Sequence, residues 1–210
     1  MTNKFDKDSE IVKKHAEKER AEIRRKAAAV TDQAWIQALL QRGAHGNLAT
    51  SYENQPFVTP LLYYYAVEEQ AIYFHGALAG RLRANSALNP QICFNVSEFG
   101  RVLPASTADE FNIEYNSVTA FGQIERITDH NIALQALQWL MDKYAPHLKL
   151  GVDYEDIPAD DVKGTAVYRI KIEEWSAKHH HADADFPDAY QYPYPSLISA
   201  HQKPPAPPTD

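Results

Sequence analysis

A histidine, two glycines and an arginine lie close together near the middle of the chain. An apolar, strand-like run at 72–74 ends at His75, Gly76 and Gly80 bound a turn of small residues, and Arg81 opens a basic segment of helical character. Backbone N–H groups at a helix N-terminus attract anions, and glycine lets the backbone approach a ligand closely. The guanidinium adds a fork of donors for phosphate oxygens. The segment therefore predicts a phosphate site at Arg81, although a surface arginine is the alternative by composition alone.

His75 supports two interpretations. A histidine at the end of an apolar strand is usually a hydrogen-bonded structural residue. Beside a bound flat ligand it would instead contact that ligand or transfer a proton, because imidazole exchanges protons near neutral pH.

The segments around this site show the period of two that is typical of strands. Residues 47–51, 57–67 and 71–75 are separated by short polar turns, which predicts an antiparallel meander. Pro60 cannot donate to a strand ladder, so its strand is expected at an edge or at a bulge. A short helix at 80–88 is expected to stop at Asn89 and Pro90.

Three further strands are predicted at 91–98, 115–128 and 165–174, with a loop at 99–110. Asp129 is expected to cap a helix that runs to Tyr144, and Thr31 or Asp32 to cap a shorter helix that ends at Gly43. About six strands and few helices predict a mainly β fold with flanking helices, a small six-stranded antiparallel barrel.

The two ends of the chain differ from this central part. Residues 10–29 alternate in charge and are expected to form a helix that frays or packs on a partner subunit. The last 29 residues hold seven of the 13 prolines and cannot form a core. We therefore predict three parts: a charged helical arm at 1–30, a central barrel domain at 31–178 and a proline-rich tail at 179–210.

Charge and composition narrow the classes of function. The first 30 residues hold nine basic and six acidic side chains, while the whole chain of 210 residues carries −7, so the body is acidic and should repel nucleic acid. No apolar run approaches the ~20 residues of a membrane helix, and no signal-peptide pattern is present. The single cysteine, Cys93, is expected to be a small buried hydrophobe in a cytoplasmic protein.

Two clusters invite a metal interpretation that we do not adopt. Three adjacent histidines at 179–181 have no nearby ligand pair with zinc spacing, and the carboxylates of 153–161 lack the alternation of a calcium loop. Both are expected to be solvated. No Ser-His-Asp order, P-loop lysine or dinucleotide glycine fingerprint is present.

Several short motifs together resemble the pyridoxamine-5′-phosphate oxidase-like superfamily of flavin proteins, and within it the subgroup related to nitroimidazole-resistance reductases. They span roughly residues 45–178, in the same order as in that family. The motifs are GNLAT at 46–50, PFVTPL at 56–61, IYFHG at 72–76, GRL at 80–82, NPQICF at 89–94, YNSV at 115–118, YRI at 168–170 and WS at 175–176.

The resemblance implies a split β-barrel that binds FMN in a homodimer, with two flavin sites at the subunit interface. It implies that Pro60 and Leu61 lie along the flavin ring and that Ser117 and Val118 come from the opposite subunit. It also implies that Trp175 either stacks near the cofactor or closes the barrel. The full set of implied cofactor contacts is Thr59, Pro60, Leu61, His75, Gly76, Arg81, Leu82, Ser117, Val118 and Trp175.

The sequence departs from the oxidases proper at the phosphate site. Leu82 follows Arg81, and residues 58–61 contain no basic side chain. Phosphate binding must then depend on Arg81, on backbone amides and on Arg83 or Thr59, and oxidation of a pyridoxine phosphate becomes a weaker hypothesis. The prediction is an FMN-dependent oxidoreductase that passes electrons from NAD(P)H to a small flat acceptor. The alternative is a non-catalytic flavin carrier, sensor or haem-handling module.

Overall fold

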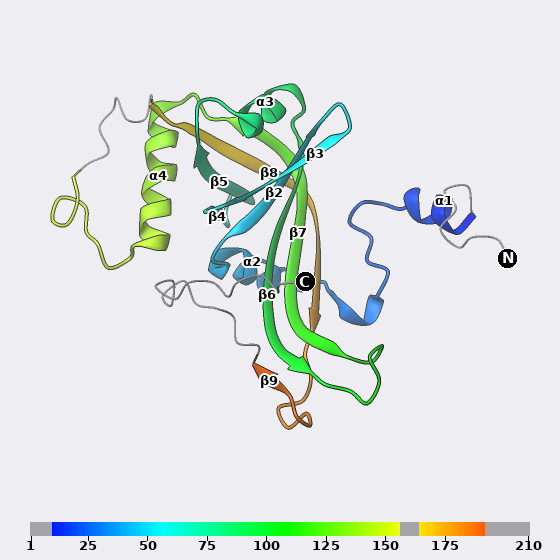
Figure 1. Cartoon of the computed structure of the whole chain (residues 1–210). Coiled ribbons are helices and arrows are strands. Elements are labelled where there is room, and N and C mark those ends of the chain that lie inside the picture. The colour runs from blue at the N-terminus through cyan, green and yellow to red at the C-terminus, as the bar shows by residue number, and fades with distance from the viewer. Residues whose placement is uncertain (1–9, 156–163, 192–210) are drawn as a thin grey trace, which may run out of the picture. The chain divides into compact units, whose positions relative to one another are not determined.

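The computed structural model describes residues 10–155 and 164–191, and most of its strands belong to one antiparallel sheet (Figure 1). The order along the sheet is β3-β2-β6-β7-β8-β5-β4, with β1 beside β8 and β9 beside β6. The strands are β1 (Ala29–Val30), β2 (Gly46–Tyr52), β3 (Gln55–Leu61), β4 (Tyr64–Ala66), β5 (Ala71–Gly76), β6 (Gln91–Leu103), β7 (Asn112–Arg126), β8 (Ala166–His180) and β9 (Tyr190–Gln191). The mainly β class with flanking helices is confirmed, although nine strands form where six were expected.

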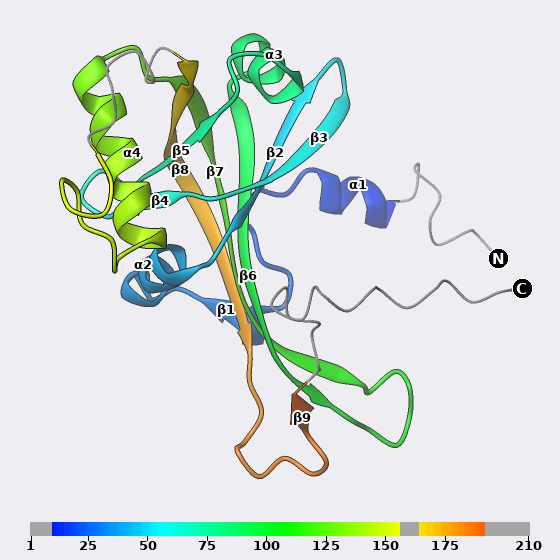
Figure 2. The ribbon, with the colours of Figure 1, turned by 60° about the vertical axis from the view of Figure 1, so that its left-hand side comes forward.

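The helices are α1 (Glu10–Ala16), α2 (Gln33–Arg42), α3 (Arg81–Leu88) and α4 (His130–Tyr144), with a 3-10 turn at Lys26–Ala28. Asp32 caps α2 and Asp129 caps α4, each accepting two backbone N–H bonds as the sequence predicted. Figure 2 shows α3 beside β2 and β3, and α4 beside β4 and β5.

The described residues divide into two compact units. Residues 10–98, 116–155 and 164–179 form the first, and residues 99–115 and 180–191 form the second. This division does not test the predicted boundaries at residues 30 and 178, so the three parts of the chain stay a prediction.

The β2–β3 hairpin forms where the turn signal predicted it. Its register runs from Gly46 opposite Leu61 to Tyr52 opposite Gln55. Glu53 and Asn54 both have positive φ, 48° and 63°, as a two-residue hairpin turn requires. β3 is an edge strand, which confirms the expectation drawn from Pro60.

The single strand predicted at 57–67 is wrong, because the chain leaves the ladder at Leu62 and Tyr63. The hydroxyl of Tyr144 binds both the N–H and the carbonyl oxygen of Tyr63 at 3.1 Å. A side chain from α4 thus replaces the strand partner, and β4 starts anew at Tyr64.

The loop predicted at 99–110 and the end predicted for the last strand are also wrong. In the second unit, β6 continues to Leu103, β7 begins at Asn112 and β9 pairs with β6. Arg101 forms a bidentate ion pair with Glu114 and lowers the pKa of that carboxyl to about 2. Among the described residues of the tail, 190–191 are therefore strand, while 192–210 lie outside the described residues.

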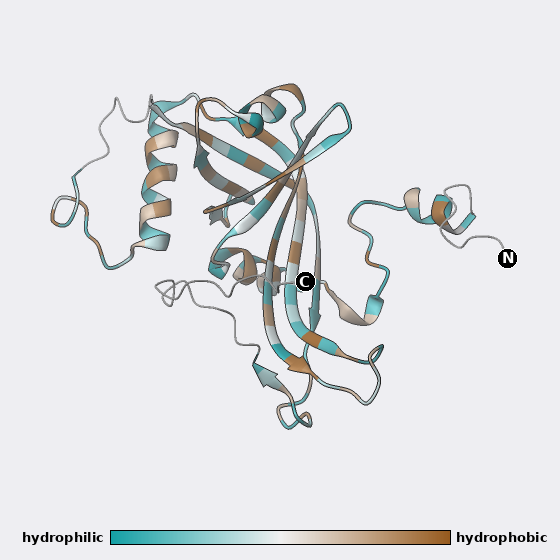
Figure 3. Ribbon diagram, in the orientation of Figure 1, coloured by the Kyte–Doolittle hydropathy of each residue, from teal (hydrophilic) through white to brown (hydrophobic). Residues whose placement is uncertain are grey.

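The core of the first unit is built from alternating apolar positions of the strands. Bands of opposite hydropathy follow one another along β5 and β8 in Figure 3. Tyr63, Phe74, Phe94 and Tyr168 are among its largest fully buried rings, with Phe74 stacked on Tyr168 at 5.0 Å. Gly122 lets β8 come close, since a Cβ there would lie 2.0 Å from the Lys171 carbonyl oxygen.

The helix predicted at 10–29 is wrong beyond residue 16. The Arg20 guanidinium binds Glu173 at 2.6 Å and Glu174 at 2.8 Å, and it lies 5.5 Å from the Phe121 ring. Ala29 and Val30 then pair with β8. The segment lacks an apolar helical face, so these contacts with its own chain give it an irregular path of turns instead.

Candidate functional site

A cavity of about 490 Å³ opens between β3, the end of β5 and the start of α3. Its volume lies within the range of about 300–1,000 Å³ that is typical of ligand sites. The wall is apolar along β3 and basic at α3. The lining residues are Phe57, Val58, Thr59, Pro60, Leu61, His75, Gly76, Ala77, Ala79, Gly80, Arg81, Leu82 and Arg83.

The basic wall exists because α3 starts at Arg81. Gly80 holds φ at +117°, a conformation that suits glycine, and no side chain caps the helix. The first N–H groups of a helix have no partner within it, so at α3 they face outward as donors.

Two asparagines fix α3 on the sheet. Asn85, only 1% exposed, donates to the Thr50 hydroxyl at 3.1 Å, and Asn89 donates to the carbonyl oxygen of Ser51 at 3.1 Å. These bonds join the middle of the helix and its C-cap to β2. The position of Arg81 at the cavity is therefore set by the helix and not by a flexible loop.

The two arginines at the cavity differ from four other arginines of the chain in their partners. Arg20, Arg42, Arg101 and Arg169 each bind a glutamate. Within the described residues, neither Arg81 nor Arg83 has an ion-pair or hydrogen-bond partner. The cavity thus carries positive charge that the described chain does not neutralise, which favours an anionic ligand.

Thr59 supplies a second polar group without a partner. Its hydroxyl is buried and makes no hydrogen bond to any described residue, although Thr59 lines the cavity. A buried hydroxyl without a partner costs about 1–3 kcal/mol. The Tyr168 hydroxyl is likewise buried and without a partner, and its ring lies 3.7 Å from where a Cβ on Gly76 would be. A ligand in the cavity that bonds Thr59 would remove the cost at that residue.

His75 ends β5 opposite Val167 and is exposed at the cavity. Its imidazole makes no hydrogen bond within the described chain. The interpretation of His75 as a hydrogen-bonded structural residue therefore has no support here.

Seven of the ten predicted contacts lie together at this cavity, and three do not. Val118 is fully buried in the core, where its carbonyl accepts from Asn95, and Ser117 is half-buried on β7. Trp175 lines another cavity, beside residues 21–31. The roles of all ten residues stay a prediction.

The sequence reasoning missed Phe57 and Val58 as cavity residues. Both are exposed large apolar side chains on β3, at 38% and 57%. The period of two places Phe57 on the same face as Thr59 and Leu61, so that signal was available. Val58 shares the other face with Pro60 and reaches the cavity because β3 is an edge strand.

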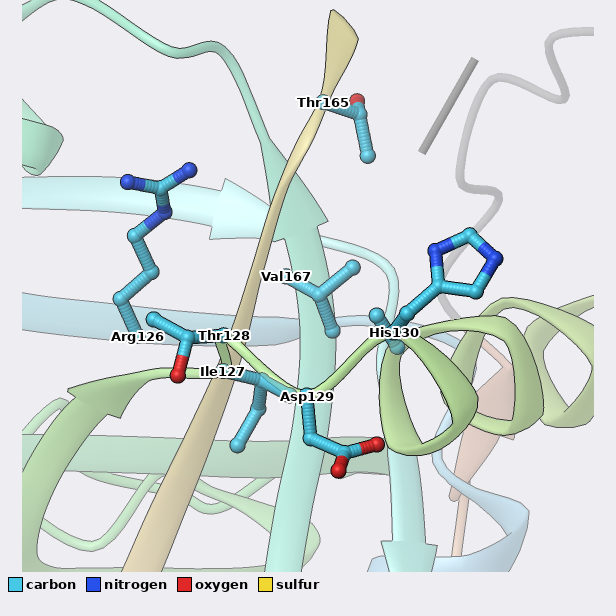
Figure 4. Close-up of a pocket in the computed structure, with 8 residues that line it drawn as sticks. Arg126, Ile127, Thr128, Asp129, His130, Thr165 and Val167 are labelled. Atoms are coloured by element: carbon cyan, nitrogen blue, oxygen red, sulfur yellow. The ribbon is translucent and has the colours of Figure 1, made fainter. Parts of the chain in front are cut away.

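A smaller cavity of about 190 Å³ lies at the start of α4 (Figure 4). Its polar groups do not converge: Arg126 and His130 point apart, and the Asp129 carboxylate accepts from the N–H groups of Asn131 and Ile132. The helix start is therefore already capped, and this cavity has no set of polar groups directed at one ligand.

Cysteine and histidine give no other site in the described chain. Cys93 is half-buried, which corrects the expectation of full burial, and burial raises the pKa of its thiol. Its thiolate is thus disfavoured as a nucleophile. His179 meets the Trp35 ring edge-on at 6.1 Å, so it is not simply solvated. In residues 10–155 and 164–191, no group of three metal-binding side chains is positioned to hold an ion.

The fold and this cavity define a class of protein: an antiparallel split barrel with a partly apolar, cationic pocket. The model of the family described as pyridoxamine 5′-phosphate oxidase matches residues 32–179, and the chain belongs to this family. The flavin-binding fold predicted from the sequence motifs is thereby confirmed.

Three solved structures are similar to this chain. The flavocytochrome Anf3 of Azotobacter vinelandii is 25% identical, with a TM-score of 0.71 over 91% of this chain and 89% of its own. The FAD and heme binding protein of Mycobacterium smegmatis is 21% identical, with a TM-score of 0.65 over 75% and 77%. A candidate 5-nitroimidazole antibiotic resistance protein of Bacteroides thetaiotaomicron is 17% identical, with a TM-score of 0.61 over 72% and 86%. A comparison with curated protein sequences finds no match.

Among the helices in the described residues, none is both long enough and apolar enough to span a membrane.

Proposed function

We propose that the protein is an FMN-dependent oxidoreductase that works as a homodimer and passes electrons from NAD(P)H to a small flat acceptor. The observation that carries this proposal is the cavity at β3 and α3, which both Arg81 and Thr59 line. Within the described residues, Arg81 has no counter-ion and the Thr59 hydroxyl has no hydrogen-bond partner. Membership of a flavin-binding family supports it.

The residues at the cavity fit a phosphorylated flavin. Arg81 and the N–H groups at the start of α3 bind a phosphate, with Arg83 adding charge at the same wall. Pro60 and Leu61 give an apolar surface for a flat ring, and the Thr59 hydroxyl bonds one of its polar atoms. A bound flavin supplies hydride and electron transfer, while the protein provides orientation and excludes water.

His75 is the residue at the cavity that can carry a proton. Its imidazole is exposed and makes no hydrogen bond within the described chain, so a ring nitrogen is available to a bound acceptor. We propose that His75 donates a proton to the acceptor as it is reduced.

The homodimer draws support from the surface around the cavity. Phe57, Val58 and Leu78 are exposed large apolar residues in the same region, and contiguous apolar patches often mark contact sites. Ser117 lies outside this cavity in its own chain, in keeping with a contribution from the second subunit.

An absorbance spectrum of the purified protein tests the proposal. We expect a flavin band near ~450 nm, bleaching under anaerobic conditions with NADH or NADPH, and faster recovery with a nitro or quinone acceptor than with air. A colourless monomer that takes up no added FMN would disprove the proposal. If the protein is yellow but neither NADH nor NADPH bleaches it, the result would favour the alternative of a flavin carrier or sensor.

A haem-handling role is the second candidate, favoured by the similarity to the flavocytochrome. The same spectrum distinguishes it, because a haem gives a Soret band and a shift on reduction with dithionite. Haem incorporated at one equivalent per chain after expression with a haem precursor would support this candidate.

A further inference from the structure

Trp175 lines a second cavity, of about 380 Å³, which shares no residue with the cavity at β3 and α3. One side is formed by β8 and α2, with Trp175 and Ile36. The other side is formed by the N-terminal segment, with Ala21, Ile23 and Val30. All of these residues belong to the first compact unit.

The N-terminal segment crosses this cavity as a strap, which we define as residues 21–28. The strap is attached at its two ends, by Arg20 to Glu173 and Glu174 and by the pairing of Ala29 and Val30 with β8. In the described chain, residues 21–28 hydrogen-bond only to neighbours between Lys18 and Ala29. Nothing else bonds the middle of the strap to the sheet.

The ion pairs of Arg20 with Glu173 and Glu174 break readily. The Arg20 side chain is 35% exposed, and its glutamate partners are 37% and 41% exposed. Ion pairs of this kind contribute little and weaken in salt. The two-residue pairing of β1 with β8 then acts as the hinge end of the strap.

The walls of the cavity indicate the chemistry of an occupant. Ile23, Val30, Ile36 and Trp175 give apolar surface and one large ring, and the Glu22 carboxylate is already bonded to Lys18. An indole face favours stacking with another flat ring. Lys26 also lines the cavity, but it is exposed, so an ion pair with it would contribute little. A charged ligand would therefore lose hydration here without gaining a strong partner.

We propose that this cavity is a second binding site, for a small uncharged aromatic molecule, and that the strap is its lid with Arg20 as the latch. Entry requires release of Arg20 from Glu173 and Glu174. The site is separate from the flavin cavity and does not depend on the function proposed for it.

The test uses 1-aminoanthracene, an uncharged flat fluorophore, added to the full-length protein with and without saturating FMN. We expect one probe per chain, at equal affinity in both cases. Arg20→Met should raise the association rate of the probe about three- to ten-fold. Arg42→Met is the matched control, because Arg42 also binds a glutamate bidentately at the surface but away from this cavity.

Salt and a filled cavity give two independent readouts. Sodium chloride at about 1 M should speed association in the parent protein but not in Arg20→Met. Ala21→Phe places a ring in the cavity and should abolish probe binding while leaving the FMN content unchanged. Each of three results would overturn the proposal. These are displacement of the probe by FMN, equal association rates of the probe in the two arginine variants, and no probe binding because a second copy covers the cavity.

Discussion

Arg81→Ala should remove the phosphate anchor and little else. In the described chain Arg81 has no ion-pair partner to lose, and its side chain is exposed, so the folded apoprotein should keep its stability. A hydrogen bond to a charged group is worth about 1.5–3 kcal/mol, which corresponds to about 10- to 150-fold weaker FMN binding.

Titration of the apoprotein by flavin fluorescence measures this effect. Riboflavin lacks the phosphate, so its affinity should be equal in the parent protein and in Arg81→Ala. Arg126→Ala is the matched control, because Arg126 is also exposed and has no ion pair within the described residues, but lines the smaller cavity at the start of α4.

Two results would refute the reasoning. Equal FMN affinity in Arg81→Ala and the parent would show that the phosphate binds elsewhere. An equal loss for FMN and riboflavin would show that Arg81 supports the ring or the fold and not the phosphate.

Three further predictions concern the helices and the proton donor. Asn85→Ala removes the amide that donates to the buried Thr50 hydroxyl. The variant should melt about 3–9 °C lower in calorimetry and bind FMN more weakly. An unchanged melting temperature would contradict the role of this bond. Burial lowers the pKa of Lys143 to about 8, so between pH 8 and 10.5 the unfolded chain binds more protons than the folded chain, and the free energy of unfolding should rise with pH. Lys143→Met should be more stable than the parent at pH 7 and should lose that rise in denaturant titrations. If the variant keeps the same slope with pH, Lys143 is not its source. His75→Ala should keep its flavin content but lose acceptor turnover in steady-state assays, whereas equal turnover would exclude His75 as the donor.

Local signals in the sequence were sufficient for much of the fold. Asp129 was recognised as a cap, and Asp32 as one of two candidates with Thr31, because a carboxylate bonds N–H groups only two or three residues away. The turn before β3 and the edge position of Pro60 follow from the backbone preferences of single residues. The start of a helix at Arg81 was likewise predicted from neighbouring residues.

Strand ends were predicted poorly because distant partners set them. β3 stops where the Tyr144 hydroxyl bonds both backbone polar groups of Tyr63, and these two residues are 81 positions apart in the sequence. The N-terminal segment ends its helix early because Arg20 finds carboxylates about 150 residues along the chain. Neither partner is visible in the neighbouring sequence.

The sequence by itself determined that a small-residue turn precedes an arginine at a helix start, within an antiparallel β protein, and that its motifs match one flavin-binding family. Only the tertiary structure decided which of those residues share a cavity, because strand order and helix packing bring Thr59 and Arg81 to the same cavity. It also separated Trp175 from them and placed that ring under residues 21–28. Short-range hydrogen bonds and backbone preferences fix local structure, whereas the walls of a cavity depend on long-range pairing and burial.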